Sequence, residues 1–142
     1  MAQINDEKIE LAYFPDGIVD CLSLGSGLVM IGVPILDGLY KSSAGQYLKN
    51  NDYDCRELGL EFLFEDLIAY PDQIREGGAG ALLVVRSSVE MVDHRIIPAC
   101  YALRIAPAQD ENGNRFYEVQ DIDIHYNLKR HDRVLWEREE SK

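Results

Sequence analysis

A long apolar run and a long alternating run, on either side of an Asn-Gly pair, constrain the fold of this chain more than any other feature. The run 96–106 is apolar at nearly every position, as in a central strand covered on both faces. Asn112-Gly113 is the strongest two-residue signal for a β-hairpin, because both residues accept the positive φ angles of a tight turn. The run 115–128 then returns beside the first. These segments predict a pair of long antiparallel strands.

The returning run changes the phase of its alternation. Tyr117 and Val119 are apolar at odd positions, whereas the later apolar residues stand at even positions: Ile122, Ile124, Tyr126 and Leu128. A slip of one residue moves every side chain of a strand to the opposite face. We therefore predict a β-bulge or a break near Gln120-Asp121.

Further strands are expected elsewhere in the chain. Residues 9–14 and 18–24 are rich in apolar side chains and flank Pro15-Asp16-Gly17, a trio that favours a turn, which predicts an N-terminal β-hairpin. A short buried strand is predicted over 28–36, which Pro34 ends or pushes to an edge, and a last short strand within 133–139. Residues 81–92 fit a strand or a helix, and the β-branched Val84-Val85 pair after Leu82-Leu83 favours a strand.

The middle of the chain predicts helices. From position 60, apolar residues recur at i, i+3, i+4, i+7 and i+8, which is one face of an α-helix: Leu60, Leu63, Phe64, Leu67 and Ile68. Asp54 and Glu57 have the spacing of an N-cap and its partner, and Tyr70-Pro71 ends the helix. A weaker helix is expected over 37–50 and a short one over 72–76.

Length and composition fit one folded unit. A chain of 142 residues, 46% of them hydrophobic, can bury a core without disulfides or metal and is not disordered throughout. We predict a flexible N-terminus at residues 1–8 and a single α+β domain at 9–142. Its mainly antiparallel sheet would combine the N-terminal hairpin with the C-terminal strands and pack against central amphipathic helices. The alternative is two small sheets joined by the helical middle.

The charge balance limits the partners of the chain. There are 14 Lys+Arg against 25 Asp+Glu, a net charge of −11, which opposes binding to nucleic acid and to anionic membranes. The first ten residues have no cationic and apolar regions, so no signal peptide is expected. Cys21, Cys55 and Cys100 form no Cys-x-x-Cys pair, which predicts three reduced thiols in a cytoplasmic protein. No cofactor is predicted.

The negative charge is concentrated in one segment. Residues 52–76 contain eight acids and two arginines, a net charge of −6. Glu57, Glu61 and Glu65 are spaced i, i+4 and i+8, which predicts one ridge of charge along the main helix. Like charges at i, i+4 cost a helix about 0.2–0.5 kcal/mol per pair, so this ridge does not stabilise the helix. We therefore predict a face that binds a basic partner protein, formed by Asp54, Glu57, Glu61, Glu65 and Asp66. The alternative interpretation is a solvated face that maintains solubility.

Two further candidate sites lie near the C-terminus. In a regular strand Asp121, Asp123 and His125 share one face with Asn127, and the first three could bind a divalent metal. The basic cluster at 129–133 could bind a phosphate or carboxylate through three side chains: Arg130, His131 and Arg133. The competing interpretations are a solvated strand face and a solvated turn.

Nothing in these patterns requires an enzyme, because no serine lies in a nucleophile elbow. We predict a non-enzymatic acidic binding protein that inhibits or chaperones a basic protein, a profile shared by immunity proteins and phage anti-defence proteins. One alternative is a small-molecule, nucleotide or metal-binding protein, hydrolases included, with its site on the C-terminal sheet. The other is a homo-oligomer or phage-particle component that pairs strand edges near 133–139.

Overall fold

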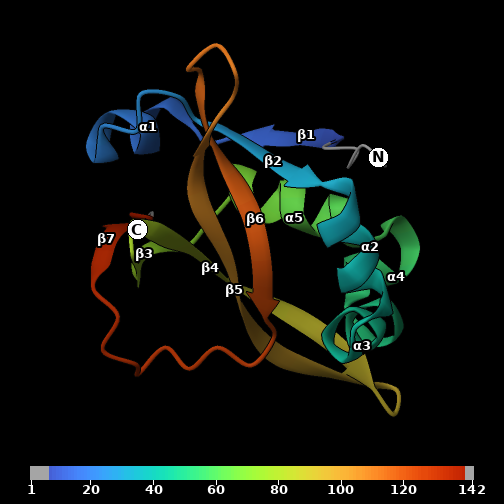
Figure 1. Cartoon of the computed structure of the whole chain (residues 1–142). Coiled ribbons are helices and arrows are strands. Elements are labelled where there is room, and N and C mark those ends of the chain that lie inside the picture. Colours follow the sequence, from blue (N-terminus) through green and yellow to red (C-terminus); the bar gives the residue numbers. More distant parts are fainter. Residues whose placement is uncertain (1–6, 140–142) are drawn as a thin grey trace.

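The computed structural model describes residues 7–139 of the chain. These residues form seven β-strands and five α-helices (Figure 1). In chain order the elements are β1 (Lys8–Tyr13), α1 (Asp16–Leu22), β2 (Leu28–Gly32), α2 (Val33–Lys41), α3 (Ser43–Asn51), α4 (Tyr53–Leu58), α5 (Leu60–Ala69), β3 (Gln73–Gly78), β4 (Ala81–Val92), β5 (Arg95–Gln109), β6 (Arg115–Asp123) and β7 (Val134–Glu137). The expected flexible N-terminus lies mostly outside the described residues, and Lys8 already belongs to β1.

All seven strands belong to one sheet, in the order β1-β2-β6-β5-β4-β3-β7. Neighbouring strands are antiparallel except for β2 and β6, which are parallel. An α+β class with a mainly antiparallel sheet is therefore confirmed, and the alternative of two small sheets is wrong. The β4–β5 and β5–β6 hairpins extend from opposite ends of the sheet (Figure 1).

The hairpin of β5 and β6 carries the predicted bulge. Ile105 pairs with Val119, but the preceding Arg104 pairs with Asp121, so Gln120 is an extra residue in β6. The turn is closed by Asp110, whose Oδ1 accepts hydrogen bonds from the backbone N–H groups of Asn112 and Asn114. The bulge keeps apolar side chains on one face of β6 before and after position 120.

Only part of β5 is covered on both faces, contrary to the expectation for 96–106. Tyr101, Ala102 and Leu103 are buried, whereas Ile96 is 69% exposed near the tip of the β4–β5 hairpin. The strands predicted over 81–92 and within 133–139 are confirmed as β4 and β7.

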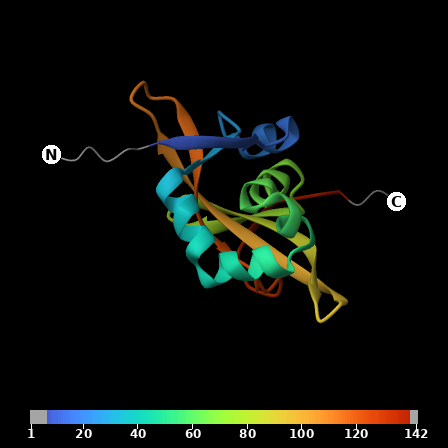
Figure 2. The ribbon, with the colours of Figure 1, turned by 90° about the vertical axis from the view of Figure 1, so that its right-hand side faces the viewer.

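Helix α5 lies at the centre of the core. Its side chains predicted to form an apolar face are at most 1% exposed: Leu60, Leu63, Phe64, Leu67 and Ile68. The helix contacts both β1 and β4, and α1 contacts β7, so the sheet curves around α5. Figure 2 shows α5 between β1 and the β4–β5 hairpin.

The predicted N-terminal hairpin is wrong, because residues 18–24 do not form a strand. Residues 16–22 form α1, and β1 pairs instead with β2. Ile18 and Leu22 are spaced i, i+4, and Ile18 is buried, which is the pattern of a short helix. Ser23 then adopts a left-handed conformation with φ 52° and ends the helix.

The helix expected over 72–76 is also wrong, since residues 73–78 form β3 between β4 and β7. The backbone N–H of Asp72 donates to Val85 O, which starts this pairing directly after Pro71. Ile74 and Arg75 are both buried, one on each face of the strand.

The single long helix expected from Asp54 is two helices, α4 and α5. Gly59 separates them with φ 95°, a conformation that favours glycine. The N-cap of α4 is Asp52 rather than Asp54, because Asp52 Oδ1 accepts from Cys55 N at 2.8 Å. Glu57 therefore lies on a different helix from Glu61 and Glu65, and the continuous ridge of charge does not form.

None of the described helices combines the length and the apolar character that a membrane-spanning helix needs.

Candidate functional site

Two of the five predicted partner-binding acids are occupied by neighbouring side chains. Asp66 Oδ2 lies 2.5 Å from Arg86 Nη2, and Arg86 also donates to the carbonyl oxygen of Asp66. Glu61 accepts a hydrogen bond from the Tyr40 hydroxyl. Burial, together with the Glu61 carboxylate, raises the pKa of Tyr40 to about 12. Glu61 and Asp66 thus connect α5 to α2 and to β4.

The other three acids have no ion pair or side-chain hydrogen bond within residues 7–139: Asp54, Glu57 and Glu65. Large exposed side chains lie on the same elements, beside Asp54 and Glu57 on α4 and at the end of α5, which carries Glu65. Tyr53 and Leu58 on α4 are 57% and 59% exposed, and Tyr70 after α5 is 69% exposed. We call these six residues the acidic–aromatic surface.

A groove connects the two helices of this surface. Asp54 and Tyr70 line the same open groove of about 490 Å³, which runs along β4 at Ser87, Ser88 and Val89. Its remaining lining residues, Asp72, Arg86 and Arg138, are engaged in the ion pairs Arg86–Asp66 and Arg138–Asp72. The groove exists because β3 pairs with β4 only as far as Val85, which leaves the following residues of β4 without that neighbour. Exposed aromatic groups beside unpaired carboxylates are suited to binding another protein.

A second site lies on the face of the sheet turned away from the helices. This hollow of about 190 Å³ is lined by Gly77, Leu83, Ala102, Arg104, Asp121, Asp123, Tyr126, Arg130 and Asp132. The register places Asp121 opposite Arg104 and Asp123 opposite Ala102. The hollow thus brings Asp121 and Asp123, predicted as metal ligands, to the predicted anion-binding Arg130.

Residues 124–133, which we call the strap, cross this face between β6 and β7. Tyr126 N donates to Cys100 O at one end, and Glu76 N donates to Arg133 O at the other. Tyr126 is 4% exposed and packs on Leu83 and Ala102. The strap therefore forms a fixed wall of the hollow.

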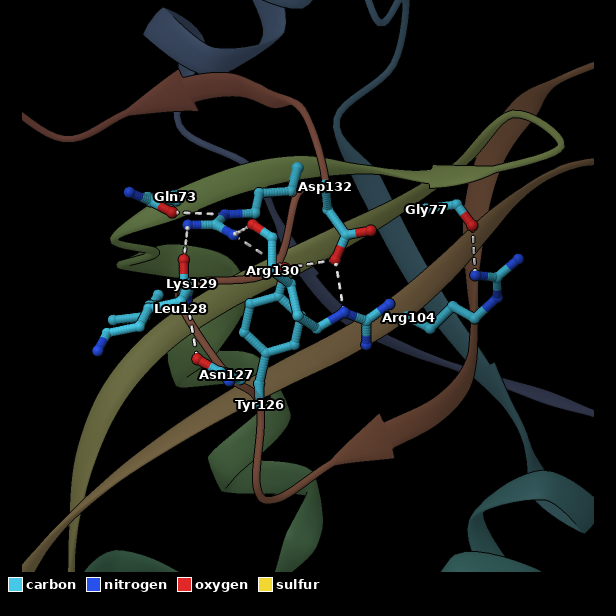
Figure 3. A network of polar contacts seen from close by, with 10 residues as sticks. Gln73, Gly77, Arg104, Tyr126, Asn127, Leu128, Lys129, Arg130 and Asp132 are labelled. Carbon is cyan, nitrogen blue, oxygen red and sulfur yellow. Dashed lines mark hydrogen bonds and ion pairs between the residues drawn. The ribbon is translucent and has the colours of Figure 1, made fainter.

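Arg75 on β3 binds the strap through hydrogen bonds from its guanidinium group. It is 5% exposed and donates hydrogen bonds to the Tyr126 hydroxyl and to the carbonyl oxygens of Leu128 and Arg130, at 3.0–3.3 Å. Asp132 accepts from the Tyr126 hydroxyl at 2.7 Å and pairs with Arg130 Nε at 3.1 Å. Figure 3 shows Tyr126, Arg130 and Asp132 joined in this network, with Arg104 beside it.

The predicted metal site of Asp121, Asp123 and His125 is not assembled. Within residues 7–139 no group of three or more His, Cys, Asp or Glu side chains is placed to hold a metal ion. The prediction required a regular strand through Asn127, but β6 ends at Asp123. His125 is instead stacked edge-on against Tyr47, with ring centroids 5.9 Å apart.

The predicted anion-binding cluster is also divided. Arg130 lines the hollow, whereas His131 and Arg133 are exposed and do not line it. Two lining residues that sequence reasoning missed are Arg104 and Asp132. Arg104 is a charged position in an otherwise apolar strand, which was the available signal.

Sequence reasoning also missed a buried polar cluster between β4, β5 and the start of α4. The Tyr101 hydroxyl lies 2.7 Å from Asp52 Oδ2 and 3.0 Å from Glu90 Oε2. Tyr101 and Asp52 are completely buried, and Glu90 is 5% exposed. Ser88 donates to Asp52 and Tyr47 donates to Glu90. Burial and the two carboxylates raise the pKa of Tyr101 far above its ordinary value.

Comparison with protein-family models, with curated proteins and with solved structures finds no match to this chain.

Proposed function

We propose that this chain is a non-enzymatic acidic binding protein that engages a basic protein partner and inhibits or chaperones it. The acidic–aromatic surface is the proposed contact. The observation that carries the proposal is the coincidence of unpaired carboxylates on Asp54, Glu57 and Glu65 with exposed Tyr53, Leu58 and Tyr70.

The two kinds of side chain have different roles in such a contact. Carboxylates attract a basic partner over distances of about 10 Å and raise its association rate, an effect that salt screens. Tyrosines supply the desolvated contact area that holds a complex together and slows its dissociation. A net charge of −11 extends the attraction beyond the surface itself.

A cytoplasmic location belongs to the same proposal. Cys21, Cys55 and Cys100 are all free thiols, which fits a reducing compartment. Burial, with the Asp52 carboxylate as the next cause, raises the pKa of Cys55 to about 11, so this thiol is suited to packing rather than to nucleophilic chemistry.

Affinity capture with two charge-reversal variants tests the proposal. The test variant carries Asp54→Lys, Glu57→Lys and Glu65→Lys, and the control carries Asp20→Lys, Asp37→Lys and Glu111→Lys. The control changes the same number of charges, on α1, α2 and the β5–β6 turn. We expect a basic protein that wild type and control retain at low salt, that high salt removes, and that the test variant does not retain.

A second variant separates the contribution of the tyrosines to the dissociation rate from the contribution of the acids to the association rate. Tyr53→Ala with Tyr70→Ala keeps every charge, and it should accelerate dissociation while leaving the salt dependence of association unchanged. Equal retention of the partner by wild type and the charge-reversed surface would show that the acids only solvate the protein.

A further inference from the structure

Two arginines line the hollow, and part of each guanidinium has no partner among the described residues; the Arg104 side chain makes two hydrogen bonds, whereas the Arg130 side chain is 52% exposed and makes one ion pair. Arg104 donates from Nη1 to Gly77 O at 2.6 Å and from Nε to Gln120 Oε1 at 3.0 Å. Arg130 pairs with Asp132 at Nε and lies over the Tyr126 ring, 5.4 Å from its centroid. Arg104 Nη2 and both terminal nitrogens of Arg130 have no hydrogen-bond partner within residues 7–139. These free guanidinium donors are suited to a carboxylate.

Side chains of opposite charge line the hollow, and none of those described forms an ion pair across it. Asp121 is the direct cross-strand partner of Arg104, yet the described residues form no ion pair between Arg104 and Asp121 or Asp123. Each aspartate uses one oxygen locally: Asp121 Oδ1 accepts from Ile122 N, and Asp123 Oδ1 accepts from His125 N. The second oxygen of each is left for a donor. Two aspartates without an ion pair in the described part of the chain and two incompletely paired arginines therefore border one space, together with Asp132, which is paired with Arg130.

The size and the walls of this space restrict its occupant. A volume of about 190 Å³ is smaller than the roughly 300–1,000 Å³ of pockets for drug-sized ligands. Leu83, Ala102 and the Tyr126 ring supply the apolar part of the lining. A ligand of a few carbon atoms that carries both a cation and an anion matches these walls.

We propose that the hollow binds a small zwitterion with the chemistry of an α-amino acid. Its carboxylate would be bound by Arg104 and Arg130, its ammonium group by Asp121 and Asp123, and its side chain by Tyr126. This site is separate from the acidic–aromatic surface, and the proposal does not depend on a protein partner.

Three matched probes test the proposal on the wild-type protein: norvaline, pentanoate and butylamine. Pentanoate lacks the ammonium group of norvaline, and butylamine lacks its carboxylate. Titrations followed by amide NMR should show saturable shifts at Gly77, Ala102 and Tyr126. For a ligand this small we expect a dissociation constant of about 1 mM for norvaline, and binding of the other two weaker by about tenfold or more.

Variants then test which side chains bind the ammonium group and which bind the carboxylate of norvaline. Asp123→Asn should weaken norvaline about tenfold and remove its advantage over pentanoate, because the ammonium group loses its charge-assisted bond. Arg130→Gln should weaken norvaline and pentanoate alike. Asp93→Asn and Arg95→Gln, which make the same changes in the exposed β4–β5 turn, should have no effect.

Two results would overturn the proposal. One is the absence of saturable shifts with norvaline in wild-type protein, which needs no variant to fold. The other is equal binding of norvaline and pentanoate, which would identify a plain anion site. Neither result bears on the acidic–aromatic surface, so the two proposals can fail separately.

Discussion

Asp52 joins α4 to the sheet, and replacing it with alanine should be strongly destabilising. Its Oδ1 caps α4 through Cys55 N, and its Oδ2 accepts from the Tyr101 and Ser88 hydroxyls at 2.7 and 3.1 Å. The side chain is completely buried. Asp52→Ala therefore removes, in one substitution, a helix cap and the acceptor of the buried Tyr101 hydroxyl and the half-buried Ser88 hydroxyl.

The magnitude follows from these contacts. Loss of an N-cap costs about 1 kcal/mol, and a hydrogen bond to a charged group contributes about 1.5–3 kcal/mol. The loss at Tyr101 is partial, because its hydroxyl can still donate to Glu90 at 3.0 Å. Removal of a buried carboxylate beside Glu90 acts in the opposite direction. We expect a net decrease in the free energy of unfolding of about 2–4 kcal/mol, or roughly 6–12 °C in Tm.

Asp52→Asn separates geometry from charge. Asparagine is as good an N-cap as aspartate, and its amide can donate to a hydroxyl that rotates to accept. We expect this variant to lose less than about 1 kcal/mol. Asp54→Ala is the matched control within the same first turn of α4, since the Asp54 side chain has no hydrogen bond within residues 7–139. It loses only the attraction of a carboxylate to the helix N-terminus and should lower stability by less than about 1 kcal/mol.

Urea unfolding of the four proteins measures these differences. The explanation by hydrogen bonding is refuted if Asp52→Asn is as unstable as Asp52→Ala, because the charge alone would then account for the loss. If Asp52→Ala lost less than about 1 kcal/mol, neither the N-cap of α4 nor the hydrogen bonds of Asp52 in the polar cluster would contribute the stability assigned to them.

Two further predictions concern pH and the strap. The folded-state pKa values of Tyr40 and Cys55 are raised to about 12 and about 11 from 10.0 and 9.0, and that of Tyr101 is raised further. The folded state favours the neutral form of these three side chains, so their contribution to stability is complete at pH values below their unfolded-state pKa values. The free energy of unfolding should therefore decline as pH rises from about 9 towards 12. Urea midpoints over this range should fall less steeply for Tyr101→Phe than for wild type or the exposed control Tyr13→Phe, and a flat wild-type profile would contradict the prediction. Arg75→Met should release the strap, with a loss of about 2 kcal/mol and faster amide exchange at 126–132. Arg133→Met, an exposed control on the strap, should leave exchange there unchanged, and equal exchange in both variants would show that Arg75 does not fasten it.

The predictions that succeeded depend on local pattern, and those that failed depend on distant contacts. The change of phase after Val119 located the bulge, because alternation directly reports which face is buried. The apolar face of α5 was equally visible in the spacing of its five core residues. By contrast, the sequence predicts a helix over 72–76, because the pairing of these residues with β4 and β7 cannot be seen in their own sequence.

The acidic segment illustrates the same limit within a correctly located helical region. The spacing of Glu57, Glu61 and Glu65 predicts one ridge only if a single uninterrupted helix carries all three, and Gly59 interrupts that helix. Its φ of 95° instead starts a new helix, in which Glu61 reaches Tyr40 on α2. Which acids remain unpaired can therefore be seen only from the fold, because the side chains that bind the other acids come from distant parts of the chain.

The hollow shows how a local signal and a distant contact combine to build a site. Because Gln120 is an extra residue, Asp121 and Asp123 face away from the helices, on the same side as Arg104. The alternation of the sequence predicted that face. Its enclosure depends on Arg75, which is more than 50 positions from the strap residues it binds. A pattern read along the chain can assign a side chain to a face, but only the contact between Arg75 and the strap makes that face a hollow.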